Sequence, residues 1–174
     1  VYNSKQLEIS QNKALSELIP KLGDNVANVR KFNAISLALH GKNAVPALMA
    51  IIRDDKQEVR NAAATALGII GTAAALELIN AHSDKRKDQE ERAAALYALG
   101  LMRHQDAFKM AEEALKNEGE DRGVRIDAAE VLGMFRDKRA VETLLAVLKQ
   151  GHKNDTLLIK KSLEALSKIK DVSE

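Results

Sequence analysis

Four histidines, whose side chains suit metal binding and acid–base chemistry near neutral pH, are scattered along the sequence. They are His40, His82, His104 and His152. A helical metal site needs two histidines four residues apart, or one histidine with carboxylates on the same helix face. No such pattern occurs, so we predict no metal site. The chain also has no cysteine, which excludes disulfides, thiolate ligands and cysteine nucleophiles.

Adjacent acidic residues, the other candidates for acid–base chemistry, occur at 54–55, 90–91 and 112–113. Consecutive residues of a helix point to different sides, so we interpret these pairs as solvated surface charge. The phosphate-binding loop, the nucleophile elbow and the dinucleotide fingerprint are absent from the sequence. We therefore predict no catalytic residue and no cofactor.

One cation recurs at a regular spacing. Three segments run from an arginine through seven residues to a glycine, at 60–68, 92–100 and 125–133, and their arginines are 32 and 33 residues apart. Such a period is typical of proteins built from stacked helical hairpins. Because an acidic turn accompanies these arginines, we predict a structural ladder that pairs with turn aspartates and sets the repeat stacking. A phosphate-binding stripe is the alternative. The ladder comprises Arg30, Arg60, Arg92 and Arg125.

A second amphipathic helix is expected before each arginine-containing helix. Apolar residues at 45, 48, 49 and 52 have the i, i+3, i+4, i+7 spacing of one helix face, and residues at 141, 144, 145 and 148 repeat it. The composition agrees, because 45% of residues are hydrophobic but only 3% are aromatic, which favours helices over sheets. We predict ten helices in five antiparallel pairs, A then B. The approximate repeats are 12–41, 43–71, 73–103, 105–136 and 138–170, expected to form a single domain over 1–174.

The pattern Val-Arg-x-x-Ala-x-x-Ala-Leu-Gly, which follows an aspartate-containing turn, resembles the short HEAT-like repeat of the phycobilisome lyases. The resemblance extends from about Leu15 to Ile169. It implies an all-α fold, a right-handed α-solenoid whose B helices line the concave face. Proteins with such repeats include scaffolds, signalling adaptors, bilin lyase subunits, a metal-dependent hydroxylase and DNA glycosylases. The His-Glu dipeptides of the hydroxylases and the tryptophans of the glycosylases are absent here.

A helical projection of the B helices predicts the partner-binding surface. If Leu67 and its equivalents face the core, the opposite side is small and apolar, as a protein-binding groove would be. We extend this projection to the first repeat by aligning Leu39 with Leu67. The alternative is that curvature buries the stripe between neighbouring B helices. The predicted concave-face residues are Leu37, Asn61, Thr65, Leu96, Tyr97, Ile126 and Glu130.

The charge balance limits the class of partner that the chain can bind. With 27 basic and 25 acidic residues the net charge is +2, whereas a nucleic-acid binder normally carries a concentrated basic surface. We therefore predict a scaffold that binds a helix or peptide of another protein. Lysines at 149, 153, 160, 161, 168 and 170 make the C-terminal region basic. We interpret them as a solvated outer face, with a patch for an acidic partner or a membrane surface as the alternative.

Two further functions stay open at this point: a bilin-lyase-like subunit that binds a tetrapyrrole, and a regulatory arm of a larger polypeptide. The second follows from the start of the chain at Val1 without an initiator methionine, as in an excised domain or a processed chain. No apolar run approaches the roughly 20 residues that span a bilayer. The default expectation is a soluble, cytoplasmic monomer, or a periplasmic or secreted one where a signal was removed.

Overall fold

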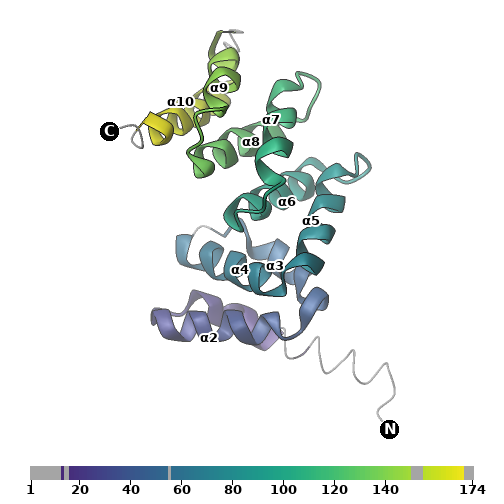
Figure 1. Ribbon diagram of the computed structural model, residues 1–174. Coiled ribbons are helices and arrows are strands. Elements are labelled where there is room, and N and C mark those ends of the chain that lie inside the picture. Colours follow the sequence, from purple (N-terminus) through teal and green to yellow (C-terminus); the bar gives the residue numbers. More distant parts are fainter. Residues whose placement is uncertain (1–12, 14–15, 55, 150–154, 171–174) are drawn as a thin grey trace. The chain divides into compact units, whose positions relative to one another are not determined.

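The computed structural model describes residues 13, 16–54, 56–149 and 155–170, and within them all regular structure is helical (Figure 1). This confirms the predicted all-α solenoid class. The chain divides into two compact units, unit 1 (Val1–Glu77) and unit 2 (Leu78–Glu174). Each unit is described by itself below, and the single domain over 1–174 stays a prediction.

Unit 1, in purple and blue in Figure 1, holds the first two helical pairs. Its B helices, α2 and α4, pack against each other, while η1 contacts both and α3 packs on α4. The elements are η1 (Ile19–Gly23), α2 (Ala27–Ala38), η2 (Gly41–Ala44), α3 (Val45–Ile51) and α4 (Gln57–Ile70).

Unit 2 continues the alternation, beginning within α5 (Thr72–Ser83). Its central helix α8 packs against three others: α6 before it, α10 after it and α7, its own A helix. The remaining elements are α6 (Gln89–Leu101), α7 (Ala107–Lys116), α8 (Arg122–Phe135), α9 (Ala140–Lys149) and α10 (Thr156–Lys170).

A left-handed residue follows four of the B helices and fixes the register of the repeats. It stands eleven residues after the ladder arginine each time. These residues are Gly41 (φ 57°), Gly71 (φ 70°), Arg103 (φ 55°) and Arg136 (φ 52°). Counted from the same arginines, the seventh residue is always a leucine with no exposed surface, and this set forms the spine of the B-helix core. It comprises Leu37, Leu67, Leu99 and Leu132.

The B helices of unit 2 approach one another closely at glycines. A Cβ atom built on Gly100 would lie 2.7 Å from Cγ2 of Val131, and one built on Gly133 would lie 2.9 Å from the backbone Cα of Ala165. Both distances are shorter than normal carbon–carbon contacts, which lie near 3.5–4.0 Å. Gly100 and Gly133, which end the second and third repeated motifs, are therefore needed for the α6–α8 and α8–α10 contacts.

Among the described residues no single helix is long and apolar enough to cross a membrane. One bent pair, Glu58–Ile70 with Thr72–Ser83, reaches that length and composition only when the two helices are taken together.

The glycine contacts give a direct stability test. We expect Gly133→Ala to lower the free energy of unfolding by about 1–3 kcal/mol, because the new methyl group meets the backbone of α10. Gly68→Ala is the matched control, since a Cβ there meets nothing within 4 Å. That change should raise stability by about 0.5–1 kcal/mol through the helix propensity of alanine. Urea unfolding followed by circular dichroism measures both, and equal effects would contradict the close-packing role.

Candidate functional site

The predicted concave groove is largely buried. Leu37 and Leu96 have no exposed surface, and Ile126 and Tyr97 are 7% and 8% exposed. The prediction that these four side chains form an exposed apolar strip is therefore wrong. Asn61 and Thr65 on α4 are exposed, as expected. Glu130 is half-buried, and its Oε2 lies 2.8 Å from Nζ of Lys161 on α10.

Two physical reasons account for this burial. The helical projection assumed that a B helix buries one face, whereas α8 has helices on three sides and is buried at every position from Val124 to Ala129. A helix that is apolar around most of its circumference belongs inside a protein. At Leu37 the alignment was also wrong, because the spacing to Gly41 makes Leu37, not Leu39, the equivalent of Leu67.

The four ladder arginines share a contact that was not predicted, beside the predicted pairing with a turn aspartate, which Arg92 makes with Asp121. Each donates a hydrogen bond to a main-chain carbonyl, which lies at the end of the preceding A helix for Arg92 and Arg125 and in the turn after that helix for Arg30 and Arg60. Carbonyls at a helix end lack partners within the helix. The arginine thus joins helix B to the end of helix A in its own repeat. The bonds run from Arg30 to Asp24 O (2.7 Å), Arg60 to Asp54 O, Arg92 to His82 O (3.0 Å) and Arg125 to Leu115 O (3.4 Å).

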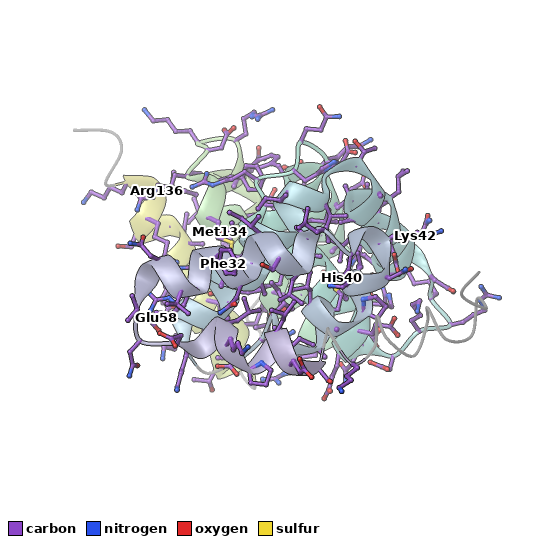
Figure 2. All side chains as sticks on the ribbon, turned by 90° about the horizontal axis from the view of Figure 1, so that it is seen from below. Phe32, His40, Lys42, Glu58, Met134 and Arg136 are labelled. Carbon is purple, nitrogen blue, oxygen red and sulfur yellow. The ribbon has the colours of Figure 1, made fainter. Side chains whose placement is uncertain are left out.

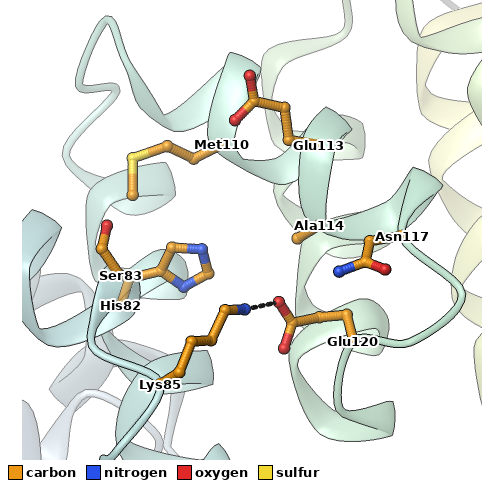
Figure 3. A pocket seen from close by; sticks show the side chains of 8 residues that line it. All are labelled: His82, Ser83, Lys85, Met110, Glu113, Ala114, Asn117 and Glu120. Atoms are coloured by element: carbon orange, nitrogen blue, oxygen red, sulfur yellow. Dashed lines mark hydrogen bonds and ion pairs between the residues drawn. The ribbon is translucent and has the colours of Figure 1, made fainter.

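Arg92 also pairs with carboxylates of the next repeat. Its Nη1 lies 2.8 Å from Oε1 of Glu120 and 2.7 Å from Oδ2 of Asp121, in the turn between α7 and α8. Glu120 also pairs with Lys85, as Figure 3 shows. Burial alone would raise the pKa of Glu120, but its hydrogen bonds with Arg92 and Lys85 outweigh that effect and lower the pKa to about 2. The turn is therefore held by an ionised carboxylate.

A pocket of about 270 Å³ lies beside this ion network (Figure 3). His82 lines it, and its Nδ1 is 3.0 Å from the carbonyl oxygen of Arg92. A carbonyl can only accept, so Nδ1 carries the proton. Burial lowers the pKa of His82, which keeps the ring neutral at pH 7. Since Lys85 and Glu120 neutralise each other across the pocket, we interpret the pocket as part of a structural network.

The three histidines that the structure describes do not gather into a reaction centre. His40 and His104 are half-buried on separate helical pairs, and His152 lies outside the described residues. Among the residues that the structure describes, no group of three histidines or carboxylates could hold a metal ion.

A different apolar surface is exposed, on α2. Phe32 is 68% exposed and Leu39 is 83% exposed. The two residues are seven positions apart, so they lie on the same side of the helix. Val29 and Ile35 widen this surface, which we call the α2 stripe (Val29, Phe32, Ile35 and Leu39). Figure 2 looks onto α2 and labels Phe32 on it. The stripe was not predicted from the sequence because Leu39 was aligned with the core residue Leu67, whereas the position of Gly41 gives the correct register.

These helical pairs, which stack through their B helices in each unit, define an α-solenoid repeat protein. The HEAT-repeat family profile matches residues 15–99 and 77–167. The chain therefore belongs to the family of HEAT-repeat proteins.

Among solved structures, one with a TM-score above 0.5 has the same fold, and two others are similar to the chain. The complex of CpcE and CpcF, the phycocyanin lyase of Nostoc, is 19% identical with a TM-score of 0.51, covering 88% of this chain and 98% of that chain. Human deoxyhypusine hydroxylase is 16% identical (TM-score 0.40, 98% and 92% covered). A designed armadillo repeat protein in complex with the peptide (KR)4 is also 16% identical (TM-score 0.45, 96% and 87% covered). No curated protein sequence matches the chain.

The ion network predicts a pH-dependent stability. Because the pKa of Glu120 falls from an ordinary 4.5 to about 2 on folding, its contribution is complete above pH 4.5 and is lost as the pH falls towards 2. We expect Glu120→Gln to cost about 1–3 kcal/mol at pH 7, and much less at pH 2.5.

Urea unfolding of the wild type and the variant at both pH values measures this difference. The control is Glu113→Gln, an exposed carboxylate that pairs with Lys109 at 3.6 Å within α7. It should change stability little at either pH. A Glu120→Gln effect that is the same at pH 7 and pH 2.5 would show that the carboxylate charge is not what holds the turn.

Proposed function

We propose that the chain is a non-catalytic protein-interaction scaffold whose α2 stripe receives a helix of a partner protein. The observation that carries this proposal is the exposure of Phe32 on α2 and of Leu39 at its C-terminal cap. Contiguous apolar side chains are seldom left in water unless a partner covers them. Full burial of a side chain of this size is worth about 1.5–3 kcal/mol.

The choice of a helix as the occupant rests on the equivalent face of α8. Counted from the ladder arginine, Ser36 corresponds to Val131, and Phe32 and Leu39 flank Ser36 on the same side. Val131 is fully buried and lies against Gly100 of α6. On α8 this face is covered by another helix, α6. On α2 the equivalent face is exposed. A helix with apolar residues at i, i+3 and i+7 fits it.

Two residues of the predicted groove, Asn61 and Thr65, are exposed on α4, which packs against α2. Ile35 and Thr65 stand at equivalent positions, five residues after Arg30 and Arg60, and both are exposed on helices that pack together. Asn61 lies one helical turn before Thr65 on α4 and is also exposed. We propose that these residues form the polar margin of the helix-binding surface.

A crosslinking experiment tests this function. A photoreactive amino acid at position 39 of the full chain, used in lysate of the source organism, should trap one protein through an amphipathic helical segment. Capture alone does not support the proposal. That segment, made as a synthetic peptide, should bind the wild type in calorimetry and bind Leu39→Glu at least 30-fold more weakly, because the carboxylate would be buried unpaired.

The matched control is Leu157→Glu on α10 in unit 2, a leucine 42% exposed, which should leave peptide affinity unchanged. Both variants should keep the wild-type stability within about 0.5 kcal/mol, as surface substitutions do. Unchanged affinity of Leu39→Glu would overturn the proposal. So would a dimer of the chain that Leu39→Glu dissociates, since the stripe would then bind a second copy.

A further inference from the structure

We propose that the C-terminal ends of α6 and α8, together with α10, form a binding site for an acidic peptide segment, independent of the α2 stripe. A hollow of about 310 Å³ lies at these helix ends. Three cations from three successive B helices line it: Arg103, Arg136 and Lys168. Its remaining lining consists of glycine backbone and the half-buried apolar side chains of Leu101 and Met134.

The charge of this hollow is not balanced by the described part of the chain. No described carboxylate lines it, and none lies within 4.0 Å of the charged nitrogens of Arg103, Arg136 or Lys168. Cations elsewhere in unit 2 commonly have such a partner. Examples are Arg86 with Asp84 (2.8 Å), Arg122 with Asp155 (2.8 Å) and Arg139 with Asp137 (2.6 Å). The hollow therefore keeps three positive charges available to an anion.

The backbone at both arginines adds a second, independent observation. Arg103 and Arg136 have φ angles of 55° and 52°, and the equivalent residues of unit 1, Gly41 and Gly71, are glycines. The left-handed conformation disfavours residues with a side chain. The helix dipole attracts a cation at this end, but this gain is of the same order as the conformational cost. It does not explain why arginine replaces glycine in both repeats, whereas a role for the side chains does.

Arg103 is held ready for a ligand. The Cζ of its guanidinium lies 5.8 Å from the ring centroid of Phe135, and Phe135 packs edge-on against Phe108. A cation–π contact does not use the N–H groups of the guanidinium as hydrogen-bond donors, so these stay available. Those donors match the two oxygens of a carboxylate.

The surroundings favour a peptide over a nucleic acid or an inorganic ion. Leu101 and Met134 offer apolar contact between the cations, which suits a segment that alternates acidic and apolar side chains. Met134 and Arg136, neighbours on the end of α8, are labelled in Figure 2. A nucleic-acid site would need a longer basic track and stacking aromatics. No aromatic residue lines this hollow.

Fluorescence anisotropy with the full chain tests the site. The probe is a labelled hexapeptide that alternates glutamate and leucine, and the reference peptide carries glutamine in place of glutamate. We expect binding of the acidic peptide only, weakened at least tenfold between 50 and 300 mM salt. We also expect Arg136→Gly to weaken it at least fivefold while its melting temperature stays equal to the wild type or rises, because glycine relieves the left-handed backbone.

The control is Arg86→Gln, an exposed arginine paired with Asp84, which should bind the peptide like the wild type. Equal binding of the two peptides, or full affinity in Arg136→Gly, would overturn the proposal. So would inorganic phosphate or a single-stranded oligonucleotide that displaces the peptide at the peptide's own concentration, since the hollow would then be a general anion site. A lower melting temperature in Arg136→Gly with unchanged peptide affinity would assign Arg136 to structure alone.

Discussion

The close approach of successive B helices is the constraint on which the architecture depends. Where Gly100 meets Val131 and Gly133 meets Ala165, there is no room for even one methyl group. At that distance α8 is covered by α6 and α10 as well as by its own A helix, α7. A helix enclosed in this way is buried over most of its circumference, as α8 is at every position from Val124 to Ala129.

The arginine ladder follows from the same constraint. A helix with neighbours on three sides has little surface on which to satisfy polar groups, and the last carbonyls of the preceding A helix lack partners within their own helix. A long side chain with several donors can reach those carbonyls from the start of the B helix while its stem packs against apolar neighbours. Arg92 extends this arrangement to the next repeat through Glu120 and Asp121. The repeated arginine therefore connects the helices within a repeat, and Arg92 also connects its repeat to the next.

The all-α solenoid class could be predicted from the sequence, because the period of the arginine and glycine positions survives substitution at the residues between them. Exposure was harder to predict. The helical projection gives the direction of Tyr97 or Ile126 but not how many neighbours lie in that direction, and the number of neighbours decides burial. The α2 stripe was missed through a shift of two residues, which exchanged the core residue Leu37 for the exposed Leu39. The left-handed position, marked by Gly41 and Gly71, is the signal that fixes the register.

Both proposed surfaces occur where the packing constraint is relaxed. On α2 the face that α8 buries against α6 stays open, so side chains with core chemistry become a surface. Arg103 and Arg136 lie just after α6 and α8, eleven residues after the ladder arginine of their repeat. The fold requires only a left-handed backbone at this position, which a glycine adopts without strain. An arginine at that position in both repeats adds nothing that the stacking requires. A repeat protein can acquire binding residues without disturbing its core at positions where packing does not require a particular side chain. Arg103 and Arg136 occupy such positions.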